Sequence, residues 1–250
     1  MSRPVVLVTG GAGVIGRAIT QAMIADGWRV VCLDRAGAID QLEHEEFVTP
    51  LACDITDHQQ LASIVAQCGE LAALVNCAGI VEFGPLMDTD LESWRRTFEV
   101  NVTAPFALIR LAAPALARSG RGAIVNITSI TARRASVGRA AYGPSKAALE
   151  GLTRQAAVEL APLGIRCNAV APGPVESPLS IANLSAKDYA DYVASIPSGR
   201  FSSAAEVADA VAYLCSERAG SVTGQCLAVD GGWLAAGAGM WRLRENAGQR

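Results

Sequence analysis

Tyr142 and Lys146 are the residues whose types and spacing most directly indicate chemistry. They stand four positions apart in Tyr-Gly-Pro-Ser-Lys, and side chains at i and i+4 share one face of a helix. A phenol, with a pKa of about 10, is a poor base at neutral pH. A lysine cation about 4 Å away is worth up to ~4 kcal/mol at an effective dielectric of ~20 and would make the phenolate accessible. The pair is a candidate acid/base; the alternative is an exposed Tyr beside a Lys on a helix surface.

Ser129 stands thirteen residues before Tyr142, where an apolar run with strand character ends. The carboxyl ends of parallel strands are where α/β sheets bind ligands. A hydroxyl there can hold a substrate oxygen while Tyr142 moves its proton. Two alternatives stay open: Ser129 caps the end of the strand, or Thr128 takes this role instead.

Residues 9–16 read Thr-Gly-Gly-Ala-Gly-Val-Ile-Gly between a predicted first strand and a predicted first helix. The glycines permit a tight turn and a close backbone approach, and Gly16 lets the helix pack on the strand. The helix start offers N–H groups and a positive dipole end to a pyrophosphate. We therefore expect Gly10, Gly13, Val14, Ile15 and Gly16 to bind a dinucleotide, although such a turn alone also marks ordinary loops.

Asp34 lies eighteen residues past Gly16, at the end of the predicted second strand. A carboxylate there accepts hydrogen bonds from the ribose hydroxyls of adenosine and repels a 2′-phosphate, which favours NAD. Arg35 could soften that repulsion and leave NADP open, and the alternative for Asp34 is a solvated turn residue. Asp54, followed by Ile55, could face the adenine edge or could equally be a loop residue.

These residues must be positioned by alternating strands and helices. Short apolar runs predict strands at residues 4–9, 29–33, 47–52, 72–76, 123–128, 165–170 and 226–229. Helical patterns fall at 14–25, 57–67, 91–118, 146–160 and 204–217, the third read as two helices with a break near 100–102 and a kink at Pro114. Asp57 can cap a helix, Pro144 suits a first turn and Gly164 suits a helix end. The pattern predicts a parallel sheet covered on both faces, in one domain spanning 1–250.

Composition excludes several classes of function. The 250 residues include two His and, among 21 basic residues, two Lys, so a zinc or iron site and a Ser-His-Asp hydrolase are not expected and the metal prediction is none. A net charge of -3 argues against a nucleic-acid binder. The longest run without a charge has 13 residues, too short for a membrane span. The seven Cys are scattered, which is typical of a reducing cytosol, so we expect a cytoplasmic protein.

The combined motifs resemble the short-chain dehydrogenase/reductase family, in its branch of roughly 250 residues. Besides the glycine turn, Asp34, Asp54, Ser129, Tyr142 and Lys146, the matching elements are Asn76-Cys77-Ala78-Gly79, Asn101, Pro172-Gly173-Pro174-Val175 and Val229-Asp230-Gly231-Gly232. The resemblance implies a doubly wound Rossmann sheet of seven parallel strands in the order 3-2-1-4-5-6-7, a nicotinamide dinucleotide and a homotetramer.

The resemblance also implies roles for the site residues. Tyr142 would be the acid/base, Ser129 would steady the reacting oxygen, Lys146 would bind the nicotinamide ribose and lower the pKa of Tyr142, and Asn101 would anchor a water that relays the proton. Further cofactor contacts would come from Asn76, Ala78, Gly79, Pro172, Gly173, Val175 and Ser177. The chain departs from the family at Cys77, where Asn is usual, and at Val14, where this branch usually has Gly.

Three segments could shape the substrate side. Residues 177–200 could form an apolar lid through Ile181, Leu184, Tyr189, Tyr192 and Val193, or could include an ordinary surface helix. Arg133, Arg134 and Arg139 could attract an anionic substrate or form a solvated face. The tail 234–250 could pack on a neighbouring subunit through Leu234 and Trp241, or fray.

The expected function is that of an NAD(H)-dependent oxidoreductase that interconverts a secondary alcohol and a ketone. One alternative is a 3-oxoacyl-thioester reductase that uses NADPH. A sugar-nucleotide epimerase or dehydratase would need a substrate domain that this chain length does not accommodate. A dinucleotide sensor would need no acid/base pair. The expected partner is a small-molecule alcohol or ketone.

Overall fold

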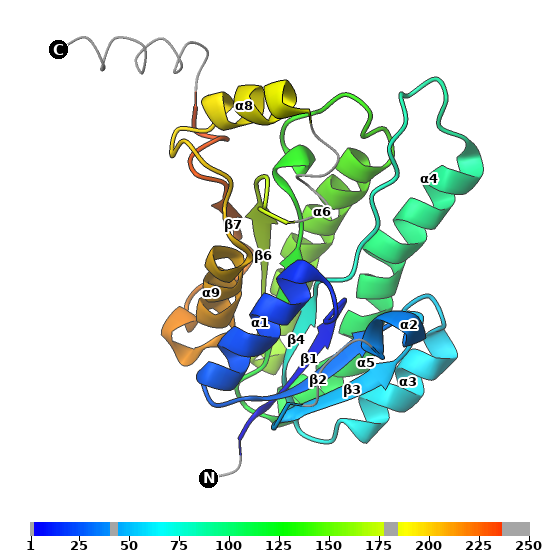
Figure 1. The fold of residues 1–250 in the computed structure, drawn as a ribbon. Coiled ribbons are helices and arrows are strands. Elements are labelled where there is room, and N and C mark those ends of the chain that lie inside the picture. The colour runs from blue at the N-terminus through cyan, green and yellow to red at the C-terminus, as the bar shows by residue number, and fades with distance from the viewer. Residues whose placement is uncertain (1–2, 41–44, 178–184, 237–250) are drawn as a thin grey trace, which may run out of the picture.

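The computed structural model describes residues 3–40, 45–177 and 185–236. Seven strands form one sheet in the order β3-β2-β1-β4-β5-β6-β7, as predicted (Figure 1). Every neighbouring pair of strands is parallel. The strands are β1 (Val5–Thr9), β2 (Arg29–Asp34), β3 (Val48–Ala52), β4 (Leu71–Asn76), β5 (Ala123–Ile127), β6 (Arg166–Pro172) and β7 (Cys226–Val229).

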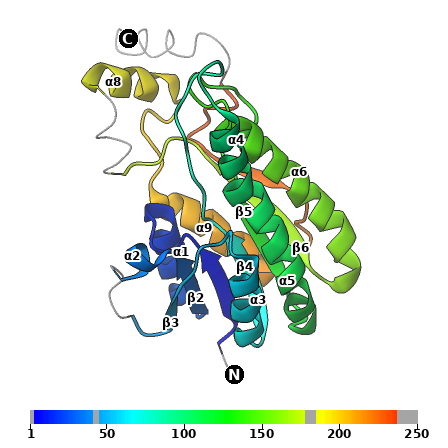
Figure 2. The same cartoon turned by 90° about the vertical axis from the view of Figure 1, so that its right-hand side faces the viewer.

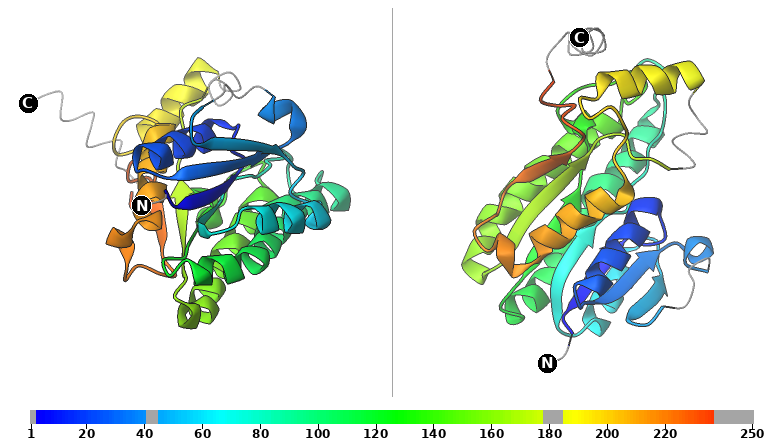
Figure 3. Two further views of the ribbon diagram at one scale, coloured as in Figure 1. Left: turned by 90° about the horizontal axis from the view of Figure 1, so that it is seen from below. Right: turned by 60° about the vertical axis from the view of Figure 1, so that its left-hand side comes forward.

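Helices cover both faces of the sheet (Figure 2). One face carries α1 (Val14–Ala25) and α9 (Ala204–Cys215), and the other carries α3 (His58–Gln67), α5 (Ala104–Arg118) and α6 (Tyr142–Leu160). The short α2 (Ala36–Ile39) follows β2, and α8 (Ala186–Ser195) lies at the opposite end of the molecule from the start of β1 (Figures 1 and 3). That the whole chain is one domain stays a prediction.

Two apolar cores hold these layers together. Alternation along β1 sends Val6 and Val8 into the core under α1 and α9, and Leu7 into the core under α3 and α5. All three side chains are fully buried, and burial of a Val or Leu side chain contributes roughly 1.5–3 kcal/mol. Because the central strands are fixed on both faces, their carboxyl ends form a rigid edge on which a site can be built.

The residues predicted to mark helix starts and ends lie at such positions in the structure. The Asp57 carboxylate accepts hydrogen bonds from two N–H groups at the start of α3, and Gly164 adopts a φ of +72° where the chain leaves the turn after α6. Pro144 lies in the first turn of α6, where a missing N–H does no harm. That helix begins at Tyr142, four residues earlier than predicted, so Tyr142 and Lys146 lie on one helix.

Residues 91–118 form one continuous helix, so the predicted break between two helices is wrong. α4 (Leu91–Phe98) passes into α5 through a π-helical turn, η1 (Glu99–Thr103), and α5 continues through Pro114. The disturbance predicted near 100–102 therefore exists as a widened turn, and π-turns often occur at functional sites. By length and composition alone this helix could cross a membrane, but half of its apolar stretch is buried inside the protein, as in a core helix.

Candidate active site

A cavity of about 950 Å³ lies along the carboxyl ends of the first four strands. The glycine turn follows β1, Asp34 ends β2, Asp54 follows β3 and Ala78 follows β4. The topology therefore brings distant motifs to one edge. Thirteen predicted cofactor residues line this cavity: Gly10, Gly13, Val14, Ile15, Gly16, Asp34, Arg35, Asp54, Ile55, Ala78, Gly79, Val175 and Ser177.

The start of α1 fits a negatively charged phosphate. No side chain caps this helix of 12 residues, and its first turn contains no acidic residue. Its first N–H groups and dipole are thus available to an anion. A Cβ on Gly13 would have a single neighbour, the Gly10 oxygen at 3.3 Å, and Gly13 borders the cavity. The turn therefore leaves room for a pyrophosphate, and the residues present fit a dinucleotide.

Glycine is required at two positions of this turn for reasons of packing. Gly10 has a φ of +66°, and a Cβ there would lie 2.7 Å from the Ala78 Cα. A Cβ on Gly16 would lie 2.1 Å from the Gly10 oxygen. Val14, the departure from the family pattern, is the first residue of α1 and is 46% exposed. Its φ is not positive, so the valine introduces no backbone strain.

Two carboxylates are fixed on the cavity wall. Asp34 Oδ2 accepts a hydrogen bond from the Ala12 N–H at 3.1 Å, and Asp34 Oδ1 accepts one from the Arg35 N–H at 2.8 Å. Asp54 Oδ1 accepts from the N–H and the hydroxyl of Thr56, at 2.9 and 2.8 Å. These bonds lower the pKa of Asp54. Both predicted residues therefore reach the cavity, while what each binds stays a prediction.

Ser129 joins the Tyr142 phenol at the carboxyl end of β5. Burial raises the pKa of Tyr142, and the nearby Ser129 hydroxyl and the charge of Arg139 oppose that rise without outweighing it. Ser129 Oγ also accepts from the Thr131 hydroxyl at 2.9 Å and from the Thr131 N–H at 3.2 Å. Ser129 thus caps the next turn and meets Tyr142 as well. The rival Thr128 donates its hydroxyl to the Val170 carbonyl at 3.1 Å, on β6.

Lys146 is a buried cation behind this pair. Its Nζ donates to the Ile127 carbonyl at 2.8 Å and lies 5.7 Å from the centroid of the Tyr142 ring. A Cβ on Gly79 would lie 3.2 Å from that Nζ, which places the amine against the cavity wall. Burial lowers the pKa of Lys146 from 10.5 to about 8. Burial is thus the largest influence on both groups, raising the pKa of Tyr142 and lowering that of Lys146, and the predicted lowering of the Tyr142 pKa by Lys146 stays a prediction.

Asn101 is brought to the same place by the π-turn η1. Its Oδ1 accepts from the Ile80 N–H at 2.9 Å, and its Nδ2 donates to the Ile80 carbonyl at 3.1 Å and to Ser145 Oγ at 3.0 Å. The side chain is fully buried. A Cβ on Gly79 would lie 3.2 Å from Asn101 Oδ1 as well as from the Lys146 amine. Asn101 and Lys146 thus share one corner of the site.

Four further predicted cofactor residues do not line this cavity. Asn76 does not line the cavity; its Nδ2 donates to Asn126 Oδ1 at 2.8 Å and ties β4 to β5. A Cβ on Gly173 would lie 2.8 Å from the Asp230 Cα, so Gly173 serves the packing of the loop after β7. Pro172 ends β6 and is buried, and neither Pro172 nor Tyr142 lines the cavity.

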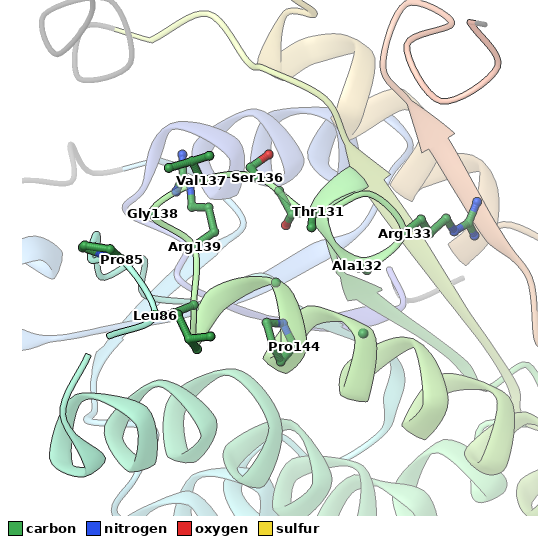
Figure 4. A pocket seen from close by; sticks show the side chains of 14 residues that line it. Pro85, Leu86, Thr131, Ala132, Arg133, Ser136, Val137, Gly138, Arg139 and Pro144 are labelled. Atoms are coloured by element: carbon green, nitrogen blue, oxygen red, sulfur yellow. The ribbon is translucent and has the colours of Figure 1, made fainter. Parts of the chain in front are cut away.

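Arg133, Arg134 and Arg139 are close in the sequence but lie in different surroundings in the structure. Arg133 Nε lies 3.2 Å from Glu150 Oε1, and its Nη2 donates to the Cys226 carbonyl at 3.1 Å; in Figure 4 its side chain points away from Arg139 toward β7. Arg134 is exposed. Arg139 alone lies by the phenol, with its guanidinium carbon 5.5 Å from the centroid of the Tyr142 ring. The arginines therefore do not form one anion-binding cluster.

Comparison with known proteins identifies the family. Residues 10–234 match the family model described as Enoyl-(Acyl carrier protein) reductase. The chain is 34% identical to 2-keto-3-deoxy-L-fuconate dehydrogenase of Xanthomonas campestris (91% of this chain, 79% of the relative). It is 37% identical to cis-4-hydroxycyclohexanecarboxylate dehydrogenase of Sinomonas cyclohexanicum (92% and 96%). The chain belongs to the short-chain dehydrogenase/reductase family.

Solved structures of short-chain dehydrogenases/reductases share the fold. One, from Beutenbergia cavernae, is assigned as an NAD(P)-dependent gluconate 5-dehydrogenase and holds NADP at low occupancy. It has a TM-score of 0.88 and 32% identity, covering 94% of this chain and 98% of its own. The relatives are dehydrogenases of alcohol- or ketone-type substrates, and the Beutenbergia structure holds a nicotinamide dinucleotide.

Three parts of this short-chain dehydrogenase/reductase site were not found from the sequence. Thr131 bonds Ser129, Ser145 accepts from Asn101, and Glu82 pairs with Arg96 on the cavity wall. No local pattern marks the Glu82–Arg96 pair, since its members come from a loop and from α4. Thr131 could have been found from its position two residues after Ser129.

The substrate side is only partly described. Residues 178–184, with Ile181 and Leu184, and residues 237–250, with Trp241, lie outside the described residues. α8 buries none of its side chains, and Tyr189 packs on Phe201 with ring centroids 4.9 Å apart. Leu234 is held locally, since its N–H donates to Asp230 Oδ2 at 2.8 Å. Within residues 3–40, 45–177 and 185–236, no group of three or more His, Cys, Asp or Glu could hold a metal ion.

Proposed function

We propose that this protein is an NAD(H)-dependent oxidoreductase that interconverts a secondary alcohol and a ketone. The observation that carries the proposal is the Ser129 hydroxyl beside the Tyr142 phenol, near enough to act on its pKa, with the buried amine of Lys146 one helical turn away. Relatives named for a hydroxycyclohexanecarboxylate and a ketodeoxyfuconate support the same class of substrate.

The chain's own residues would hold the substrate oxygen and move its proton. A bound nicotinamide accepts or supplies the hydride. Ser129 Oγ hydrogen-bonds the substrate oxygen, and Tyr142 takes the hydroxyl proton during oxidation or donates it to the ketone during reduction. Because burial raises the pKa of Tyr142, the phenol is protonated at neutral pH, which suits donation to a ketone. Oxidation should therefore speed up as the pH becomes alkaline.

Lys146 and Asn101 would support this proton transfer. By resemblance to the family, Lys146 holds the nicotinamide ribose and Asn101 anchors a water toward solvent. Both stand against Gly79 at the cavity wall, which agrees with these roles. Ser145 links Asn101 to the backbone of the acid/base, since it accepts from Asn101 and donates to the Tyr142 carbonyl at 2.7 Å.

Asp34 supports NAD as the cofactor. Two backbone N–H groups fix its carboxylate on the cavity wall, where it can accept hydrogen bonds from ribose hydroxyls and repel a 2′-phosphate.

Tyr142→Phe tests the proposal most directly. The substitution removes one hydroxyl, so turnover of alcohols, followed by the absorbance of reduced cofactor, should fall at least about 100-fold, the usual scale of acid/base catalysis. NAD should still bind. Tyr213→Phe is the matched control, because Tyr213 lies on α9, away from the site. Near-normal turnover by Tyr142→Phe would remove the proposed acid/base.

A 3-oxoacyl-thioester reductase that uses NADPH is the second candidate. The description of the matched family model, an acyl-carrier-protein reductase, favours it, as does the position of Arg35 on the cavity wall. Rates with NADPH and a 3-oxoacyl thioester, compared with those for NAD and simple secondary alcohols, separate the two candidates.

We also propose a cytoplasmic homotetramer. The seven cysteines are free thiols, buried or partly buried, which suits a reducing compartment. Leu91, Phe106 and Val158 are large apolar residues exposed by 67%, 45% and 74% on α4, α5 and α6, so these helices offer apolar surface to a neighbour. A molar mass near 104 kDa, about four times 25.9 kDa, by light scattering would support the assembly; a monomer mass would contradict it.

A further inference from the structure

Arg139 is a half-buried cation beside the candidate acid/base. Its guanidinium carbon lies 4.1 Å from the centroid of the Phe83 ring and 5.5 Å from that of Tyr142. Within the described part of the chain, no carboxylate pairs with it. Other arginines do have such partners: Arg96 with Glu82, Arg133 with Glu150 and Arg200 with Glu206. A cation that is partly removed from water and unpaired is a site for an anion.

We propose that Arg139 binds a carboxylate of the substrate, so that the substrates are hydroxy acids and the corresponding keto acids. This inference rests on the proposed function. A guanidinium binds a carboxylate through two parallel N–H···O bonds. A carboxylate is favoured over a phosphate because, among the three arginines of this described loop, Arg139 alone is half-buried without a carboxylate partner: Arg133 is engaged by Glu150, and Arg134 is exposed.

The backbone holds Arg139 in place before any ligand arrives. The Gly84 N–H donates to the Gly138 carbonyl at 3.2 Å, and the Arg139 carbonyl accepts from the Gly143 N–H at 3.1 Å. The loop is thus tied both to the segment after β4 and to the start of α6. Stacking on Phe83 orients the guanidinium further. A preorganised cation loses less conformational freedom when it binds an anion.

The surface around Arg139 is apolar, so the part of the substrate that lies on this surface should be apolar as well. Phe83 is 71% exposed, Leu86 74% and Val137 99%. A cavity of about 530 Å³ is lined by Leu86, Val137, Arg139 and Thr131 among others (Figure 4). Its wall reaches Thr131, which bonds Ser129. An apolar ring or chain between the carboxylate and the reacting carbon would cover these side chains.

The test compares acids with neutral compounds of the same shape. Wild type, Arg139→Gln and Arg139→Lys are assayed with NAD and the 3- and 4-hydroxycyclohexanecarboxylates, then with the corresponding carboxamides. Loss of a charged hydrogen bond should raise KM for the acids about 10- to 100-fold in Arg139→Gln, with little change for the carboxamides. Arg139→Lys should recover part of the loss. Arg134→Gln, in the same loop, is the matched control and should behave as wild type.

A second measurement uses an anion that cannot react. Cyclohexanecarboxylate should compete with the alcohol in wild type and in Arg134→Gln, but not in Arg139→Gln, and cyclohexanecarboxamide should not compete. Thermal unfolding shows whether Arg139→Gln remains folded; if it does not, Arg139→Lys and the inhibition of wild type decide.

The outcomes distinguish this inference from the proposed function. Equal KM changes for acids and carboxamides, or wild-type preference for neutral alcohols, would overturn the role of Arg139 and leave the proposed function intact. If no secondary alcohol or ketone exchanges hydride with NAD(H) or NADP(H), both fail.

Discussion

Replacing Lys146 with methionine should stabilise the cofactor-free protein while removing its turnover. Burial lowers the pKa of Lys146 from 10.5 to about 8, which means that the folded state disfavours the charged amine. That difference corresponds to about 3 kcal/mol at about 1.4 kcal/mol per pKa unit. Methionine has a similar length and no charge, so Lys146→Met removes this penalty.

The loss of one hydrogen bond reduces the stability gained by Lys146→Met. Lys146 Nζ donates to the Ile127 carbonyl at 2.8 Å, and leaving that carbonyl without this donor costs about 1–2 kcal/mol. The variant should therefore be more stable by about 1–2 kcal/mol at pH 7. For a chain of 250 residues, each kcal/mol of this gain raises Tm by about 2–4 °C.

The stability gained by Lys146→Met should decrease as the pH rises. Below pH 8 the amine is charged in both states, so wild type carries the full penalty. Between pH 8 and 10.5 the folded amine loses its proton before the unfolded one, and the penalty disappears. The advantage of Lys146→Met should thus be largest at pH 7 and small at pH 10.5, in urea unfolding without cofactor and with a thiol reductant.

Lys187 provides the matched control, because it is the second of the two lysines. Its side chain is 83% exposed and lies 2.6 Å from Asp191, so Lys187→Met should leave the stability nearly unchanged. A Lys146→Met variant that is less stable than wild type at pH 7, or whose advantage is the same at pH 7 and pH 10.5, would refute the argument from burial.

Other predictions concern the cofactor and the thiols. Asp34→Ala should weaken NAD more than NADP in fluorescence titrations of both cofactors; an unchanged ratio of Kd values would count against Asp34 as the selector. Gly16→Ala should unfold at a much lower temperature, because its Cβ would lie 2.1 Å from the Gly10 oxygen, whereas Gly13→Ala should keep its Tm and lose NAD affinity; equal Tm values for the two would contradict this. The free energy of unfolding should fall above pH 9, by up to about 1.4 kcal/mol per thiol per pH unit, because unfolded thiols ionise near 9.0 while burial raises their folded pKa to about 11 or 12. Urea midpoints at pH 8 and pH 10 under reductant check this, and equal midpoints would contradict it. The thiols are Cys32, Cys53, Cys68, Cys77, Cys167, Cys215 and Cys226.

Local spacing allowed much of the fold and site to be predicted. Apolar runs located all seven strands, and the motif resemblance supplied their order. The glycine turn, Asp34 and Asp54 reach one cavity because the carboxyl ends of parallel strands meet at one edge. The break expected in residues 91–118 was wrong, since a π-turn accommodates the disturbance without interrupting the helix.

The sequence by itself determined that Tyr142 and Lys146 share a helix face, because an i, i+4 spacing is a local property of the chain. It could not determine their protonation, which depends on how far other elements bury them, and burial here raises one pKa and lowers the other. Nor could it separate the clustered arginines. Only the tertiary structure places Glu150 against Arg133 and leaves Arg139 beside the phenol, because these contacts join segments that the fold alone brings together.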